Sequence, residues 1–274
     1  LGRDGEAVAW FKRGLDTLPA DSDLPPQRRF AIRRAVETLE RRWGASLSLS
    51  RGVASTAGAV TPGAETVTQA GGEVWWRVGG YNDGRPVDVF ARAYGTLDAD
   101  GARATGGDTA QGWIGVRWKP LSAANLVLEA SKMVALGDQA RDDVMLRALW
   151  STETGGDLRF DRDAWPSARI YVDVARVVGD QQTLAVVDGR AGWTWRTTDS
   201  DMLTVGAGAR AYYDSLLSDP TAAGAGPRLN WRHWFRGDRY RAPGSYVDFN
   251  LGYDFSLAGG DRGEGVSAGL TLVY

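Results

Sequence analysis

The sequence predicts an all-β membrane protein, a 12-stranded antiparallel transmembrane β-barrel that follows a short N-terminal helical hairpin. The first observation behind this prediction is a period-two alternation of apolar and polar residues from Ala45 onward. The second is composition, because 36 Gly and 12 Trp occur among 274 residues while the mean hydropathy stays at -0.31. The third is that no stretch approaches the ~18 to 20 consecutive apolar residues of a transmembrane helix. A helical membrane protein is therefore excluded, whereas a barrel needs only alternating apolar residues.

The first 43 residues differ from the rest because their apolar residues recur at helical spacing. Ala7, Trp10 and Phe11 mark one helix, and a second periodic run extends from Pro26 to Trp43. The second run carries a basic stripe, whose members are Arg28, Arg29, Arg33, Arg34, Arg41 and Arg42. We expect this stripe to be an ordinary solvated face or, alternatively, a surface for acidic groups such as lipid phosphates. Residues 1–43 are thus predicted to be a periplasmic hairpin that ends a longer helical array, and residues 44–274 to be the barrel.

Twelve candidate strands follow, each bounded by Gly, Pro, Asn or Asp. Their length of about ten residues suits a strand that crosses a bilayer, and an even number is typical of bacterial barrels. The segments lie near residues 45–55, 73–81, 86–96, 110–119, 124–135, 142–151, 167–178, 183–196, 202–214, 227–236, 245–256 and 264–274.

The alternation is clearest in the segment near 245–256. Val247, Phe249 and Leu251 share one face there, while Asp248 and Asn250 share the other. A soluble antiparallel sandwich would alternate in the same way, so the aromatic residues decide between the two folds. They fall mostly toward strand ends, as in the interfacial girdles of membrane barrels. This predicted girdle comprises Trp75, Trp76, Trp113, Trp118, Trp150, Trp165, Trp193, Trp195, Trp231, Trp234, Tyr213, Tyr253 and Tyr274.

Topology gives a check on the strand assignment. Helices before the first strand and an even strand count place both ends of the barrel on one side, which we assign to the periplasm. The connections after odd-numbered strands are then extracellular and should be longer, as 56–72, 97–109 and 215–226 are. Residues 152–166 and 179–182 do not fit this pattern, which leaves the strand boundaries open at those two places.

The polar face of the predicted strands would line the barrel interior. Its charges have both signs, and tyrosines lie among them. The predicted lining residues are Arg77, Arg92, Arg117, Glu129, Arg147, Arg169, Tyr171, Asp173, Arg190, Arg210, Tyr212, Arg232, Tyr246 and Asp248. One interpretation pairs these charges into ladders that stiffen a closed barrel. The other makes them the wall of a hydrophilic conduit that offers hydrogen bonds and stacking to a sugar chain.

Catalytic and metal-binding patterns are scarce. The single histidine, His233, is in phase with Trp231 and Phe235 and would face lipid. Facing residues expected on the adjoining strands include no Ser, so a lipid-modifying barrel enzyme is the least favoured function. With no Cys and a lone His, we expect no metal site and no cofactor. The net charge of -2 excludes a strongly basic nucleic-acid binder.

The C-terminal residues form an apolar strand that ends on an aromatic side chain. Leu270, Leu272 and Tyr274 resemble the C-terminal assembly signal of bacterial outer-membrane proteins, which implies the barrel assembly machinery as a partner. Closure would pair this strand with the first one and leave no edge.

Four segments of the chain resemble one known family. They are QGWIGVRWKPL at 111–121, NLVLEASKMVALGDQARDDVMLRALWS at 125–151, YRAPGSYVDFNLGYDF at 240–255 and GGDRGEGVSAGLTLVY at 259–274. These segments resemble the C-terminal outer-membrane barrel region of the bacteriophage N-four adsorption protein A (NfrA-type) family, with similarity over about 45–274. The resemblance implies an outer-membrane barrel preceded by tetratricopeptide-like periplasmic helices. It implies no catalytic residue.

The resemblance also implies a function. Members of the family are expected to work with an inner-membrane glycosyltransferase complex in exporting an exopolysaccharide, and a member can serve as a phage receptor. Together with the predicted lumen, this favours a porin-like outer-membrane conduit through which a polysaccharide chain permeates passively. The alternative is a plugged barrel that acts as a membrane anchor or surface receptor. The expected partners are outer-membrane lipid and the polysaccharide, with no nucleic acid.

Overall fold

The computed structural model describes residues 3–17, 23–53, 66–100 and 104–274. Two helices come first, α1 (Asp4–Thr17) and α2 (Pro26–Glu40), and neither is both long and apolar enough to cross a membrane. Two short 3-10 helices, η1 (Gly106–Thr109) and η2 (Gly260–Gly263), lie in later connections. The strands are β1 (Trp43–Val53), β2 (Thr66–Val78), β3 (Val87–Ala99), β4 (Gln111–Trp118), β5 (Asn125–Ala135), β6 (Asp143–Thr154), β7 (Ala164–Val177), β8 (Gln182–Arg196), β9 (Asp201–Asp214), β10 (Thr221–Phe235), β11 (Ser245–Ala258) and β12 (Gly265–Val273).

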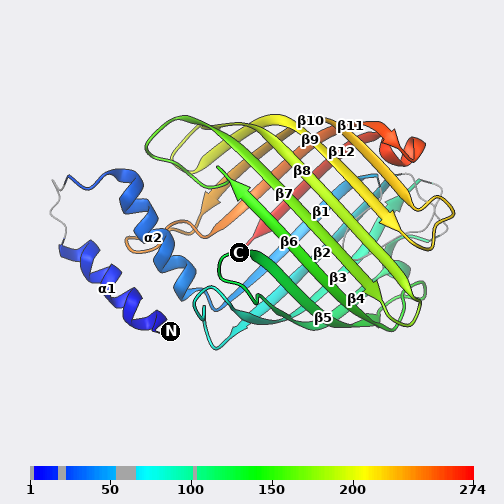
Figure 1. Cartoon of the computed structure of the whole chain (residues 1–274), viewed down its shortest axis with the longest axis horizontal. Coiled ribbons are helices and arrows are strands. Elements are labelled where there is room, and N and C mark those ends of the chain that lie inside the picture. Colours follow the sequence, from blue (N-terminus) through cyan, green and yellow to red (C-terminus); the bar gives the residue numbers. More distant parts are fainter. Residues whose placement is uncertain (1–2, 18–22, 54–65, 101–103) are drawn as a thin grey trace.

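The strands close into one antiparallel barrel in which each strand pairs with its neighbours in the chain (Figure 1). The seam joins β1 to β12, where Leu49 lies opposite Leu270. Tyr274 extends the seam, because its backbone exchanges hydrogen bonds of 2.8 and 3.1 Å with that of Ala45. Closure leaves none of the twelve described strands with an unpaired edge. The predicted 12-stranded antiparallel barrel with a preceding helical hairpin is confirmed.

Three strands begin three or more residues earlier than the sequence predicted. They start at Thr66 in β2, Ala164 in β7 and Thr221 in β10, so parts of the expected loops 56–72 and 215–226 are strand, while residues 54–65 lie outside the described residues. Pro227 does not end β10, although a proline lacks the N–H that a ladder needs. It lies where the recorded pairing with β11 is interrupted, between the Ala225–Phe255 and Arg228–Gly252 pairs. There, Arg228 Nη1 donates to the carbonyls of Pro227 at 3.1 Å and Tyr253 at 3.0 Å.

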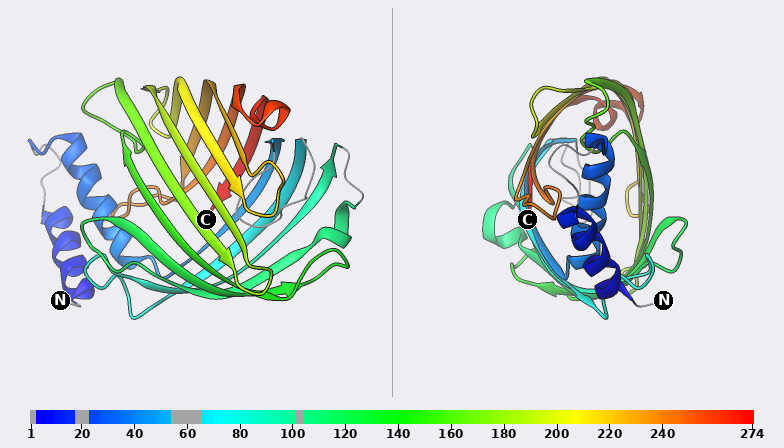
Figure 2. Two further views of the ribbon diagram at one scale, coloured as in Figure 1. Left: turned by 45° about the vertical axis from the view of Figure 1, so that its right-hand side comes forward. Right: turned by 90° about the vertical axis from the view of Figure 1, so that its left-hand side faces the viewer.

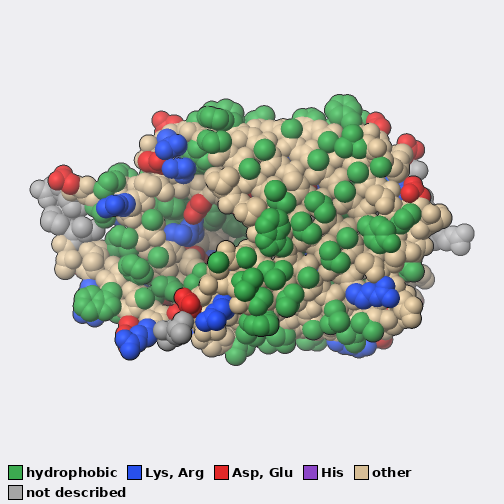
Figure 3. All heavy atoms as spheres, in the orientation of Figure 1, with side chains coloured by type: hydrophobic (Ala, Val, Ile, Leu, Met, Phe, Trp, Pro, Cys, Tyr) green, Lys and Arg blue, Asp and Glu red, His purple; other side chains and the backbone are tan. Residues whose placement is uncertain are grey.

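The outer wall of the barrel is apolar. Alternate residues of the strands expose large aliphatic and aromatic side chains, and such side chains cover the face shown in Figure 3. Examples are Val74, Trp76, Ile114, Val116, Leu146, Ile170, Val187, Val205, Phe249, Leu251 and Leu270. The opposite phase holds buried polar and charged groups, so the wall has the lipid-facing and interior-facing periodicity of a transmembrane barrel.

The predicted aromatic girdle is partly wrong. Eight of its members are exposed on the barrel, namely Trp76, Trp118, Trp150, Trp193, Trp195, Trp231, Tyr213 and Tyr274. Trp113, Trp165 and Trp234 are instead buried, and Trp75 packs against a buried cluster. Adjacent residues of a strand face opposite sides, so Trp75 and Trp76 cannot both reach lipid.

The helices lie at one end of the barrel, which we call the helix-side mouth. In the right-hand view of Figure 2, α1 and α2 stand in front of this opening. Phe30 of α2 is buried in a cluster with Leu158, Trp165 and Trp234, and its ring lies 5.1 Å from that of Phe160. The inward tryptophans at this end are therefore covered by α2, which a strand-by-strand analysis of the sequence does not include.

Part of the basic stripe of α2 docks the helix onto the barrel. Arg34 makes two hydrogen bonds to the carboxylate of Asp157, at 2.8 and 2.7 Å, and a third to the carbonyl of Pro243 at 2.7 Å. Arg33 Nη2 donates to the carbonyl of Arg241 at 2.9 Å, and Arg41 donates to that of Gly244. For these three arginines, both the solvated face and the lipid-phosphate surface predicted from the sequence are wrong.

The docking explains the long connection that did not fit the predicted topology. Residues 155–163 between β6 and β7, and 236–244 between β10 and β11, are the two segments that receive α2. The connection between β7 and β8 is short, as the sequence indicated, and covers residues 178–181. The long connection after β6 and the short connection after β7 are therefore real features of the barrel, and neither results from a misplaced strand.

Candidate functional site in the barrel interior

A row of alternating charges crosses the inner wall from β2 to β6. The strand register places opposite charges directly across from each other at every step, in the order Arg77, Asp88, Arg117, Glu129 and Arg147. Opposite charges facing each other on neighbouring strands stabilise a sheet. Because strand pairing fixes this row, the charges need no flexible loop to bring them together.

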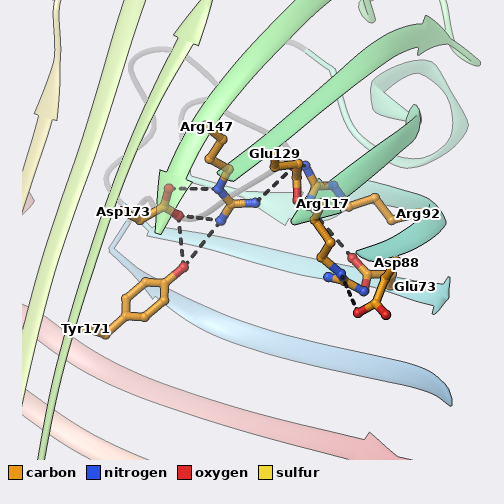
Figure 4. A network of polar contacts seen from close by, with 8 residues as sticks. All are labelled: Glu73, Asp88, Arg92, Arg117, Glu129, Arg147, Tyr171 and Asp173. Carbon is orange, nitrogen blue, oxygen red and sulfur yellow. Dashed lines mark hydrogen bonds and ion pairs between the residues drawn. The ribbon is translucent and has the colours of Figure 1, made fainter. Parts of the chain in front are cut away.

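Side-chain contacts join this row into a network, and Figure 4 shows the part from Asp88 to Arg147. Arg77 Nε lies 3.0 Å from Asp88 Oδ1, and Asp88 Oδ2 lies 3.6 Å from Arg117 Nε. Arg117 also pairs with Glu73, which lies 3.8 Å from Arg92 Nη1. The network therefore has two parallel rows, and Arg117 and Glu73 connect them.

The centre of the network is almost completely shielded from solvent. Glu129 has a side-chain exposure of 2% and pairs with Arg92, and its Oε1 also lies 3.9 Å from Arg147 Nη1. Arg147 Nε donates to Asp173 Oδ1 at 2.7 Å, and Tyr171 Oη donates to Asp173 Oδ2 at 2.9 Å. Such groups are costly to bury unless paired, and here each carboxylate has an arginine. We call the region from β2 to β6, with Tyr171 and Asp173 of β7, the ladder wall.

An apolar cluster fills the same half of the interior. It contains Phe90, Trp113, Met133, Met145, Ala175 and Val177. The Arg92 guanidinium lies 4.9 Å from the ring centre of Phe90 and 5.3 Å from that of Trp113, so charge and cluster are packed together. A cavity of about 440 Å³, lined by Glu73, Arg117, Glu129 and Tyr171 among others, adjoins the network on this side.

The other half of the wall, from β8 through β12 to β1, is built differently, and we call it the cavity wall. Small residues such as Gly206, Ala207, Ser267 and Gly269 line a further cavity of about 440 Å³. Small side chains leave free volume where the ladder wall carries long ones. This half of the interior therefore contains open space with a polar lining.

Charges on the cavity wall form separate pairs instead of a network. Arg232 makes a bidentate contact with Asp248 at 2.9 and 2.7 Å, and Asn230 donates to the same carboxylate at 3.1 Å. Arg210 Nε donates to Asp188 at 2.9 Å, and Arg210 Nη1 donates to the Tyr212 hydroxyl at 2.9 Å.

An opening beside α2 adjoins this cavity. A space of about 780 Å³ lies between α2 and the helix-side mouth, with Phe30 and Arg34 among its lining residues. It shares Glu153, Arg232 and Tyr246 with the cavity of the cavity wall. The helix thus covers the mouth without filling it, and the polar interior is approached past the side of α2.

The structure places the predicted lining residues in the interior, in two groups. The cavity of the cavity wall is lined by Arg169, Tyr171, Arg190, Arg210, Arg232, Tyr246 and Asp248. The cavity beside the ladder is lined by Arg77, Arg92, Arg117, Glu129 and Arg147. Asp173 and Tyr212 contact these arginines through the bonds given above.

Sequence reasoning missed two interior carboxylates, Glu73 and Glu153. Glu73 is in phase with Arg77 on β2, and Glu153 is in phase with Arg147 on β6. Glu73 follows from the period of two within the predicted strand, and Glu153 follows from it once β6 is extended to its observed end. Among the described residues, no three His, Cys, Asp or Glu side chains gather as a metal site would require.

The residues of the predicted assembly signal lie at the seam. Leu270 is exposed on the outer wall, and Leu272 is paired with Leu47 and Val247. The ring of Tyr274 lies 5.4 Å from that of Trp43. Their part in assembly stays a prediction.

His233 lies on the outer wall between the rings of Trp231 and Phe235, at 6.1 and 6.4 Å. Its Nδ1 is 2.9 Å from Asp201 Oδ1, and its register partners are Asp201 and Val247. Neither partner is a hydroxyl or thiol nucleophile of the kind a lipid hydrolase uses.

Residues 102–270 match the family described as bacteriophage N adsorption protein A C-term, which confirms the resemblance found in the sequence. The chain is 25% identical over 265 residues to bacteriophage adsorption protein A of Escherichia coli (strain K12). That alignment covers 90% of this chain and 26% of the relative, so the chain spans about a quarter of the relative's length.

Two solved structures are similar to this chain. The COG4313 outer membrane channel from Pseudomonas putida F1 is 12% identical, with a TM-score of 0.46 over 86% of this chain and 96% of the channel. A bacterial polysaccharide outer membrane secretin is 10% identical, with a TM-score of 0.39 over 87% of this chain and 99% of the secretin. At these identities the likeness concerns the fold alone.

Proposed function

Because the chain belongs to the family of bacteriophage N adsorption protein A C-terminal regions, and because its interior holds a polar cavity, we propose that it is an outer-membrane conduit for an exopolysaccharide. The polymer would permeate passively through the space beside the cavity wall. The carrying observation is that the small residues of β8 to β12 leave this space open next to Arg, Asp, Asn and Tyr side chains. Catalysis forms no part of the proposal.

The lining chemistry suits a sugar chain. Hydroxyl-rich ligands are recognised by planar hydrogen-bonding groups and by aromatic rings that stack on sugar faces. Asn230, Asn250 and Tyr246 supply both kinds of group in one cavity. A volume of about 440 Å³ lies within the usual range of ~300–1,000 Å³ for small-ligand sites, which is compatible with a short stretch of polymer.

The helix-side mouth would face the periplasm. The helices precede β1, and the C-terminus lies at the same end of the barrel, as expected for periplasmic termini. We propose that residues 1–43 are a periplasmic domain that ends a tetratricopeptide-like array, and that residues 44–274 are the barrel domain. The array would receive polymer from an inner-membrane glycosyltransferase complex. The barrel assembly machinery would insert the chain into outer-membrane lipid.

The conduit is tested by single-channel recording in planar bilayers. Gly269 faces the cavity, and a side chain added there meets no atom closer than 3.9 Å, so Gly269→Trp should fill the space and remove most of the current. Gly189 is a matched control. It lies in phase with the exposed Val187, and a side chain added there meets nothing within 4 Å. Gly189→Trp should therefore conduct like the parent. Absence of current through the parent chain would overturn the proposal.

A second candidate function is a plugged barrel that serves as an anchor or surface receptor. The ladder wall and its apolar cluster favour it, because their long side chains occupy much of one half of the interior. The relative's name, bacteriophage adsorption protein A, is in keeping with a receptor. A chain that folds and binds phage but passes no current would favour this function over the conduit.

A further inference from the structure

Two arginines on the inner wall face each other across neighbouring strands. Arg169 of β7 lies directly opposite Arg190 of β8, and both line the cavity of the cavity wall. Like charges in this arrangement destabilise a sheet. The ladder wall shows the opposite pattern, because its register places a carboxylate opposite each arginine of the alternating row.

Little in the wall neutralises this pair. Glu153 of β6 is the register partner of Arg169 on its other side, yet its Oε1 lies 3.7 Å from Arg190 Nη2, which is an ion pair without a short hydrogen bond. Within the part of the chain that the structure describes, no carboxylate lies at ion-pairing distance from Arg169, whose guanidinium lies 5.6 Å from the ring centre of Tyr171. One acidic group thus accompanies two basic ones.

The other arginines around the cavity differ from this pair. Arg210, Arg228 and Arg232 each hold one carboxylate of their own, from Asp188, Asp254 and Asp248. Their N–H groups are directed to protein acceptors. No such bond is made by the guanidinium groups of Arg169 and Arg190 among the described residues, although both groups border the cavity.

Free space lies beside the pair. The register row that contains Arg169 and Arg190 continues through Gly208 of β9 to Gly226 of β10, so no side chain projects from the next two strands in that row, although the Arg228 side chain extends over Gly208. Gly206 and Ser267 line the same cavity. The two guanidinium groups therefore border a volume that a ligand can occupy.

We propose that Arg169 and Arg190 form a binding site for the carboxylate of an acidic sugar unit. A guanidinium fork matches a carboxylate in bidentate geometry, and an anion between the two forks removes their mutual repulsion. Tyr171 and Tyr246 line the same cavity and offer rings to the sugar face. This inference rests on the proposed conduit and narrows its cargo to a uronate-containing, polyanionic polysaccharide.

Binding is measured by isothermal titration calorimetry on the full chain in detergent micelles, which requires no ion current. Hexagalacturonate is the acidic probe and maltohexaose the neutral one. The parent should bind hexagalacturonate more tightly, and added salt should weaken that binding. Arg169→Gln and Arg190→Gln should each reduce the affinity by about tenfold or more, since a hydrogen bond to a charged group contributes ~1.5–3 kcal/mol. Arg169→Lys keeps the charge but loses the fork, so it should fall between the parent and Arg169→Gln.

Arg176→Gln is the matched control. Arg176 lies on the same strand but is exposed, and it donates to Gln181 and Thr183. An equal loss of affinity in this variant would show an effect of overall charge and overturn the site. Equal binding of the two probes by the parent would also overturn it.

The bilayer recording separates this inference from the proposed function. Current through the parent without preference for hexagalacturonate would leave the conduit standing and remove the site. Binding that depends on Arg169 and Arg190, in a chain that passes no current, would support the site and remove the conduit.

Discussion

The ladder wall and the cavity wall belong to one barrel and share one alternation of inward and outward residues, yet their side chains occupy the interior differently. In the ladder wall, long charged side chains meet opposite charges in register, and Glu129 is 2% exposed. In the cavity wall, Gly206, Ser267 and Gly269 leave space, and Glu153 of β6, which borders this space, is 40% exposed. Strand number sets the diameter of a barrel, but side-chain volume decides how much of that diameter is filled. One half of the interior is thus held by paired charges, and the other half offers space to a ligand.

The largest expected effect comes from removing the central carboxylate of the ladder wall. Glu129→Ala leaves the buried Arg92 and Arg147 without this partner, and we expect a loss of about 3–5 kcal/mol in the free energy of unfolding. Glu153→Ala removes a long, partly exposed pair and should cost less than about 1 kcal/mol. Denaturant unfolding in lipid vesicles, followed by tryptophan fluorescence, measures both. Equal losses in the two variants would break the comparison.

A double variant tests the physical reason for that loss. Replacing Arg92 with Met and Glu129 with Leu removes both charges, while Arg147 keeps Asp173 and Glu73 keeps Arg117. Exchanging a buried ion pair for apolar residues is often close to neutral. The double variant should therefore unfold at higher denaturant than Glu129→Ala alone, and a further loss would contradict an unpaired charge as the cause.

A smaller effect is expected at the helix-side mouth, outside both walls. Arg34→Ala removes the contact with Asp157 and should weaken the docking of α2 by about 1 kcal/mol, since both groups are partly exposed. Faster proteolysis of the helices would report the loss. A double-mutant cycle with Asp157→Ala should show that the two single losses do not add. The exposed Arg28 on the same helix is the control, and equal sensitivity of Arg28→Ala would remove the assigned role of Arg34.

The smallest effect is expected in the connection that receives α2. The hydrogen bond from Arg159 lowers the pKa of Asp161 to about 2, from an ordinary value of 3.8. A lowered pKa in the folded state stabilises the fold above the unfolded value, and this stabilisation is lost as the pH falls from about 4 toward 2. Arg159→Ala should reduce the acid dependence of the unfolding midpoint in that window. An unchanged acid profile would contradict the coupling.

Much of this fold follows from residue periodicity. The period of two located all twelve strands, and the phase of His233 and of the interior arginines matches their observed sides. Pairing register was beyond such reasoning, because the row from Arg77 to Arg147 depends on how five strands slide past each other. Periodicity could not predict the free volume in the interior either, since an arginine in a ladder and an arginine beside a cavity have the same sequence pattern.

Contacts between distant segments account for the remaining errors. Arg33, Arg34 and Arg41 have the spacing of a solvated stripe, and only the approach of residues 236–244 turns them into docking groups. Trp165 and Trp234 lie near strand ends as girdle residues do, but Phe30 of α2 covers them. In both cases a helix that precedes the barrel changes the environment of residues far along the chain.

The docking of α2 has a mechanical consequence for the seam of the barrel. α2 ends at Glu40 and β1 begins at Trp43, so the helix is tied covalently to the first strand. Arg34 and Arg41 of this helix also donate hydrogen bonds to carbonyls in the connection between β10 and β11. In the barrel, β11 and β1 lie on opposite sides of β12. The helix therefore links the two sides of the seam between β1 and β12. Separation of β1 from β12 at that seam would therefore also strain the hydrogen bonds made by these arginines.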